Sequence, residues 1–190
     1  MIKKLVLAVG ILALTACSAP SDPQLVLQLD PQISIENNGQ GTAISVQTQD
    51  LRSAQFLALV DTGREQKTPL HAKQSLRVTF EDALVQLLTE QDYLVSNSST
   101  GTMRVDILDA LLNVQHSVIK HEMVAKAHVQ VVVESNKGKF VKRFTGNSSA
   151  SGLGSASVDD MSAILSNLMS NVLSEISNDS ELNTYIVENL

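Results

Sequence analysis

The sequence contains little cysteine, few aromatic residues and no tryptophan, and each shortage restricts what the protein can be. Its 190 residues include one cysteine, Cys17, so no intramolecular disulfide can form and the chain must fold on its core alone. Aromatic residues make up 3% of the chain. The core must therefore be aliphatic, and large aromatic platforms for stacking sugars or bases are not expected.

Charge is also scarce, because charged residues make up 18% of the chain and no long block of like charge occurs. Apolar residues make up 43%, which is typical of a globular protein and not of a disordered one. The length suits one domain of ordinary size and is short for two independent cores.

The sequence does contain a short apolar run behind a basic start. Lys3 and Lys4 precede residues 5–14, an apolar stretch of the length found in secretory signal peptides. It is far shorter than the roughly 20 residues that a membrane-spanning helix needs. The pattern predicts a signal peptide over residues 1–16.

The end of this stretch, Leu14-Thr15-Ala16-Cys17, resembles the lipobox of bacterial lipoproteins. The resemblance implies that Cys17 becomes the first residue of the mature protein and carries a thioether-linked diacylglycerol. A third acyl chain, such as palmitate, then joins its freed amine. Acylation would leave no thiol and so exclude redox catalysis by cysteine. The other interpretation is an ordinary signal peptide with a cysteine there by chance.

Two or three acyl chains make a stable anchor where one chain holds only marginally. Ser18 follows the cysteine, whereas an Asp there tends to retain enterobacterial-type lipoproteins in the inner membrane; we therefore expect the periplasmic side of the outer membrane. Residues 17–24 predict a lipidated cysteine and a short tether. The mature chain keeps 12 of the 14 basic residues against 20 acidic ones, a net charge of −8, so no nucleic-acid partner is expected.

Residues 25–190 are expected to form one periplasmic domain that starts with strands. Apolar and polar residues alternate over 25–29 and around 44–47, and 56–60 is a continuous apolar run, which predicts three N-terminal strands. Near Ser75 the apolar period lengthens to three or four residues, which predicts an amphipathic helix. Either Ser75 or Thr79 could cap its start.

Long alternating runs at 102–116, 121–134 and 139–145 predict an antiparallel meander joined by short turns. The alternation changes phase near residues 107–109, which predicts a β-bulge that bends the first of these strands. Residues 146–157 are nearly all small and form either a loop or an edge strand.

A second amphipathic helix is predicted from Val158, with Ser157 and Asp160 forming a capping box, and a short third helix over 180–189. Together the elements predict an α+β fold. Its curved antiparallel sheet combines the meander with the N-terminal strands, and the two long helices pack on one face.

Asp61-Thr62-Gly63 resembles the active-site triplet of aspartic proteases, in which two such triplets share a proton. One copy would require a homodimer. Arg64 follows where that family has a small residue, and its guanidinium would work against the protonated partner. A strand end followed by a turn is the interpretation we favour.

The four histidines do not predict a metal site. His121 and His128 are an odd number of residues apart on one strand and so face opposite sides, while His116 and His121 flank one turn but have no third ligand nearby. We expect them to be solvated. Gly152 and Gly154 precede a helix as in phosphate loops, but no Lys follows, so slack or close packing is the better interpretation.

The polar side of the last helices is mostly serine and asparagine with few charges. Such a face loses little on desolvation and could contact another protein. The simpler interpretation is a face exposed to solvent.

Several segments together with the lipobox resemble YajG-type bacterial lipoproteins: Ser45–Arg52, Ser75-Leu76-Arg77, Tyr93-Leu94-Val95 and Asn178-Asp179-Ser180. Asp92 departs from the Gly usual before that tyrosine, and Asp tolerates the left-handed conformation expected there. The resemblance implies fold and location, and it transfers no functional residue except Cys17, the predicted lipidation site.

We expect a protein that is not an enzyme and holds no metal or cofactor. Its predicted role is that of an accessory or scaffold subunit of an envelope complex, attached to the outer membrane by its acyl chains. The alternative is a periplasmic protein that binds a small cell-wall or apolar ligand between sheet and helix. A remote alternative is an acid hydrolase centred on Asp61.

Overall fold

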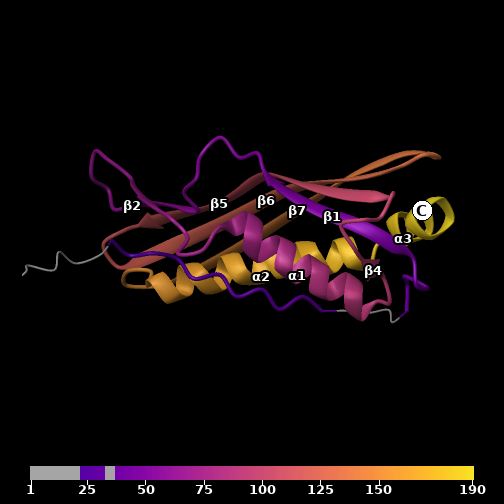
Figure 1. Ribbon diagram of the computed structural model, residues 1–190. Coiled ribbons are helices and arrows are strands. Elements are labelled where there is room, and N and C mark those ends of the chain that lie inside the picture. Colours follow the sequence, from indigo (N-terminus) through magenta and orange to yellow (C-terminus); the bar gives the residue numbers. More distant parts are fainter. Residues whose placement is uncertain (1–21, 33–36) are drawn as a thin grey trace, which may run out of the picture.

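A strongly curved seven-stranded sheet forms the framework of the computed structural model (Figure 1). The model describes residues 22–32 and 37–190, so the expected signal peptide and Cys17 lie outside the described residues. The strands are β1 (Ala43–Asp50), β2 (Ala58–Asp61), β3 (Thr68–Leu70), β4 (Leu94–Val95), β5 (Thr102–His116), β6 (Lys120–Ser135) and β7 (Gly138–Leu153). The helices are α1 (Leu76–Glu90), α2 (Val158–Ser177) and α3 (Ser180–Asn189).

The three longest strands form the predicted antiparallel meander. β5 pairs with β6 and β6 with β7 along their whole lengths. The β5–β6 register shifts between Ile107 and Asp109, which confirms the predicted bulge at these residues. β7 continues to Leu153, so most of the small-residue stretch that follows Thr145 is an edge strand and not a loop.

The sheet is mixed, and the prediction of a purely antiparallel sheet is wrong. β1 and β2 both run parallel to β5, one after the other along the same edge, with Ser45 opposite Thr102 and Ala58 opposite Leu112. The chain passes through α1 between β2 and β5, and such a crossover returns it to the same end of the sheet. Alternating residues predict a strand but not its direction.

Helices α1 and α2 pack against the sheet, α1 over β1 and α2 over β6 and β7. The short α3 lies beside the beginning of β7 (Figure 1). Ser75 is the N-cap residue of α1, so the earlier of the two predicted starts is the right one. Ser157 and Asp160 form the predicted capping box of α2. α3 begins and ends where the sequence pattern predicts.

The core is mainly aliphatic, as the composition predicts, with Phe80, Tyr93 and Phe144 as its buried aromatic side chains. The Tyr93 hydroxyl donates to Asn183 Oδ1 at 2.9 Å, and burial raises the pKa of Tyr93 to about 12. Asp92 has a φ of 67°, the left-handed conformation predicted for it. Gly146 lets α2 approach β7, because a Cβ there would lie 2.6 Å from Leu168 Cδ1.

Candidate functional site: the anchor segment and its groove

Residues 22–32, here called the anchor segment, begin five residues after Cys17 and run in extended form along α2 (Figure 1). The predicted lipidation site itself, Cys17, lies outside the described residues. The anchor segment is therefore the part of the described chain through which an anchor at Cys17 would hold the domain.

Four serine hydroxyls of α2, here called the serine ladder, accept hydrogen bonds from alternate backbone amides of the anchor segment. The pairs are Val26 to Ser162 at 3.1 Å, Gln28 to Ser166 at 3.1 Å, Asp30 to Ser170 at 2.9 Å and Gln32 to Ser174 at 2.8 Å. Four helical residues rise about 6.0 Å, and two extended residues rise about 6.6 Å. Because the two repeats nearly match, each rung of the serine ladder meets one amide.

The leucines of the anchor segment pack into the core. Leu25 and Leu27 are buried, and Leu29 packs against the core while partly exposed. The Leu25 amide donates to the His71 carbonyl at 2.9 Å, and the Lys73 amide donates to the Leu25 carbonyl at 2.8 Å. The domain thus holds the anchor segment through its leucine side chains and through backbone hydrogen bonds.

The prediction that residues 25–29 form a strand of the sheet is wrong in one respect. The segment is extended and alternates as predicted, but it forms only an isolated bridge at Leu25, and helix serines accept hydrogen bonds from its alternate amides in place of a neighbouring strand. The same finding corrects the interpretation of the polar helix face as solvated for its serines, since Ser162, Ser166 and Ser170 are buried, while the asparagines of that face are exposed. A serine every fourth residue, beside a segment with a leucine every second residue, was the signal that could have revealed the contact.

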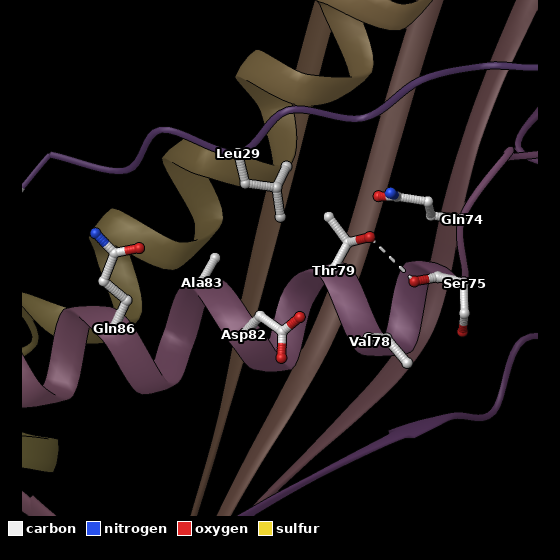
Figure 2. A pocket seen from close by; sticks show the side chains of 8 residues that line it. All are labelled: Leu29, Gln74, Ser75, Val78, Thr79, Asp82, Ala83 and Gln86. Atoms are coloured by element: carbon white, nitrogen blue, oxygen red, sulfur yellow. Dashed lines mark hydrogen bonds between the residues drawn. The ribbon is translucent and has the colours of Figure 1, made fainter.

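A surface groove lies between the anchor segment and α1, with a volume of about 530 Å³. Figure 2 shows Leu29 on one side and Val78, Asp82 and Ala83 on the other, with the amide of Gln86 at one end. Apolar and polar groups are mixed along it, so it can accommodate an amphipathic molecule. The groove is open and lies beside the helix, whereas the cavity predicted for a ligand was between sheet and helix.

Asp61 ends β2 and makes the turn that the sequence suggests. Its Oδ1 accepts a hydrogen bond from the Gly63 amide at 2.9 Å, and Lys67 Nζ lies 3.5 Å from Oδ2. The Gly63 hydrogen bond, aided by the Lys67 charge, lowers the pKa of Asp61. In an aspartic-protease dyad two carboxyls share one proton, whereas the charged group beside Asp61 is the Lys67 ammonium.

His116 and His121 come together, with ring centroids 6.2 Å apart, and both contact the loop between β7 and α2. His116 Nε2 accepts from the Ala156 amide at 3.3 Å, and His121 Nδ1 lies 3.1 Å from the Gly154 carbonyl oxygen. His121 is buried, so the expectation that the histidines are solvated is wrong for this residue. The two histidine rings therefore hold the loop between β7 and α2 in place.

Gly152 faces one of these rings, because a Cβ at this position would lie 2.7 Å from His121 Cε1. Close packing is therefore the right interpretation of this glycine. Within residues 22–32 and 37–190, no group of three or more His, Cys, Asp or Glu residues could hold a metal ion. No helix in that part of the chain is long and apolar enough to cross a membrane.

Comparison with solved structures shows that this fold recurs. A DUF330-family protein from Xanthomonas campestris has a TM-score of 0.58 and is 9% identical, over 84% of this chain and 95% of its own. A structure described as an uncharacterized protein has a TM-score of 0.52 at 12% identity, over 82% and 98%. A minor lipoprotein from Acinetobacter baumannii has a TM-score of 0.39 at 14% identity, over 77% and 91%. At such identities the first two show a shared fold alone.

Comparison with known sequences shows the family. No curated protein matches the chain at a significant level. A family model described as uncharacterized lipoprotein, Lipoprotein_16, matches residues 31–187, which is most of the chain and nearly all of the described fold. The protein therefore belongs to the Lipoprotein_16 family of lipoproteins.

Proposed function

We propose that this protein is a non-catalytic lipoprotein, held by acyl chains on Cys17 to the periplasmic side of the outer membrane. It acts there as an accessory or scaffold subunit of an envelope complex, and it is a lipoprotein of the YajG type. Membership of a lipoprotein family supports the anchor. The lipobox-like Leu14-Thr15-Ala16-Cys17 supports its position, and Ser18 supports the choice of membrane.

The observation that carries this proposal is the attachment of the anchor segment to the domain. Asp22 is five residues after Cys17, and extended chain spans at most about 3.6 Å per residue, so the domain starts within about 18 Å of its anchor. From Leu25 onward the chain is fastened by leucines in the core and by the serine ladder. A scaffold subunit acts through its position in the complex, and a domain that is held close to the bilayer in one orientation suits that role.

The residues that first suggested chemistry have structural contacts instead. Asp61 closes a turn with the Gly63 amide, and His116 and His121 brace the connection to α2. Each of these three residues has a structural contact that explains its position without a catalytic role. This supports a role in binding.

A linker insertion combined with crosslinking in cells tests the scaffold role. Photoreactive benzoylphenylalanine is placed at exposed positions such as Gln86 on α1 and Val141 on β7, and crosslinked proteins are identified by mass spectrometry. We expect one or a few envelope proteins to recur. Inserting 20 Gly/Ser residues after Ser18 should keep the acyl anchor and reduce those crosslinks several-fold, since the domain then moves freely. No recurring partner at any position would contradict the proposal.

The groove beside α1 favours a second candidate, the binding of a small cell-wall or apolar ligand (Figure 2). Ala83 lies in the groove wall, so Ala83→Trp would fill it. Lipid and muropeptide extracts of the purified lipoprotein, compared with those of the A83W variant, test this directly. A molecule that accompanies the unmodified protein and is absent from the variant would support ligand binding over scaffolding.

A further inference from the structure

The turn between β5 and β6 exposes two apolar side chains completely or nearly so. The Ser117 amide donates to the Lys120 carbonyl at 2.8 Å, and the two residues between them are Val118 and Ile119. Their side chains are 101% and 75% exposed. Leu153, opposite Lys120 at the end of β7, is 88% exposed, and the Gly154 amide donates to the Ile119 carbonyl at 2.9 Å. Val118, Ile119 and Leu153 are here called the apolar tip.

Turn chemistry does not require these residues. Short hairpin turns favour Asn, Asp and Gly, which tolerate the tight backbone and are soluble. The other tight turn of the same meander follows this rule, with Asn136 and Lys137 between β6 and β7. Three highly exposed aliphatic residues close together at one end of a domain are typical of an interaction surface.

The apolar tip lies at the end of the molecule where the anchor segment begins. The anchor segment runs in the same direction as α2, from Val26 at Ser162 to Gln32 at Ser174, so its start lies beside the first turns of α2. The loop before α2 is bonded to the hairpin, through the Gly154 amide to Ile119 and the Ala156 amide to His116. Figure 1 shows this common end opposite the end that carries α3.

We propose that the apolar tip inserts into the same bilayer leaflet that holds the acyl chains of Cys17, giving the domain a second contact with the membrane. This inference rests on the anchor of the proposed function. The chain between Cys17 and Asp22 spans at most about 18 Å, so the tip end of the domain stays near the lipid surface. Tethering makes the second contact intramolecular, and a weak insertion then becomes effective.

The chemistry of the apolar tip favours lipid as its partner. Branched aliphatic side chains gain free energy from burial among acyl chains in proportion to their apolar area. Beside the tip, Lys120 and Glu122 form an ion pair with each other, and the mature chain carries a net charge of −8. Attraction to anionic headgroups is therefore absent, and insertion depends on the apolar side chains themselves.

Site-specific fluorescence on the lipidated protein tests the insertion. The only native thiol is Cys17, so if it is acylated, single cysteines introduced by Val118→Cys, Leu153→Cys and Asn136→Cys can be labelled selectively with an NBD dye. The proteins are reconstituted in phosphatidylethanolamine and phosphatidylglycerol vesicles that contain nitroxide-labelled lipid. We expect labels at 118 and 153 to be quenched at least about threefold more than the label at 136, with blue-shifted emission. Equal quenching at all three positions would overturn the insertion.

A matched variant separates the tip from the anchor. Replacing Val118 and Ile119 by Asn and Lys (V118N/I119K) copies the other turn of the meander, and the high exposure of both side chains means that the Tm should not change. We expect the label at 153 to lose most of its quenching while the protein stays in the vesicle fraction. Undiminished quenching would overturn the proposal. Labelling of the unsubstituted protein at Cys17 would instead contradict the anchor, and with it the proposed function.

Discussion

At the scale of single residues, Arg52 closes the break between β1 and β2. Its guanidinium bonds both oxygens of Asp50, at 2.9 and 2.8 Å, and the carbonyls of Phe56 and Ala110, at 3.2 and 3.3 Å. The Arg52 side chain is 5% exposed and that of Asp50 is 15% exposed. The planar, five-donor guanidinium can meet several acceptors at once, which a lysine cannot.

Replacing Arg52 by alanine should therefore destabilise the domain. The substitution leaves a nearly buried carboxylate and two carbonyl groups without their donor, and removing one partner of a buried ion pair lowers the free energy of unfolding by about 3–5 kcal/mol. Urea denaturation at pH 7 measures the change. Lys67→Ala, which removes the exposed ion pair to Asp61, serves as the control and should leave the unfolding midpoint nearly unchanged. Equal effects of the two substitutions would contradict this role of Arg52.

The ion pair between Arg52 and Asp50 also predicts that the free energy of unfolding depends on pH. Burial alone would raise the pKa of Asp50, but the hydrogen bonds and charge of Arg52 outweigh it and lower the pKa below the ordinary value of 3.8. A group with a lowered folded-state pKa contributes its full stability above the unfolded-state pKa, and loses it as the pH falls through the folded-state value.

Asp50→Asn should accordingly be less stable than the unsubstituted protein by a constant margin between about pH 5 and 7. The margin should shrink as the pH falls below about 4, where the aspartate of the unsubstituted protein takes up its proton. Urea midpoints at a series of pH values measure it. Glu65→Gln, at an exposed loop position, is the matched carboxyl-to-amide control. A margin that persists unchanged to pH 2 would show that the charge is not involved.

At the scale of elements, the serine ladder joins an extended segment to a helix as a neighbouring strand would. Hydroxyls on one helix face replace the carbonyls of a strand, and the leucines of the anchor segment occupy core positions. Each rung is a neutral hydrogen bond with a net contribution of about 1 kcal/mol. The anchor segment is therefore held by several modest contacts that act together.

The double substitution Ser166→Ala and Ser170→Ala should loosen the anchor segment while the rest of the fold stays intact. Hydrogen exchange at Gln28 and Asp30 should become faster by about tenfold or more, since their amides lose buried acceptors. Exchange measured by mass spectrometry on the peptide that covers residues 24–32 reports this. Asn167→Ala and Asn171→Ala on the exposed side of the same helix are the controls, and should leave exchange unchanged. Equal protection in both double variants would show that the hydroxyls do not hold the segment.

At the scale of the whole molecule, the start of the anchor segment and the apolar tip share one end, and α3 with the β6–β7 turn marks the other (Figure 1). A long sheet lies between these ends. In this arrangement a lipid anchor at Cys17 would set which end of the domain meets the bilayer and how far the opposite end extends from it.

The anchor itself gives a prediction at this scale. Cys17→Ser, expressed with its signal peptide, should not acquire acyl chains and should lose most of its association with the membrane fraction after a carbonate wash. The unsubstituted protein should remain bound. Metabolic labelling with palmitate checks the acylation separately, and a C17S protein that stayed on the membrane would refute the anchor.

Much of the fold could be predicted because its signals are local. The bulge in β5, the capping box of Ser157, the left-handed Asp92 and the limits of α3 each depend on residues within a few positions of one another. The parallel direction of β1 and β2 could not be predicted this way. It depends on which edge of β5 was free, and that is a relation between segments about 55 residues apart.

The same distinction between local and long-range signals applies to the candidate site. By itself the sequence predicts residue 17 as the lipidation site, and it indicates that residues 25–29 are extended with one apolar side, because both patterns depend on neighbouring residues. Only the tertiary structure decided that serines some 140 positions later accept hydrogen bonds from amides of that segment, and that the exposed valine and isoleucine of a turn lie at the same end as the start of the anchor segment. Hydrogen bonds and surfaces form between groups that folding brings together, so no local pattern could assign their partners.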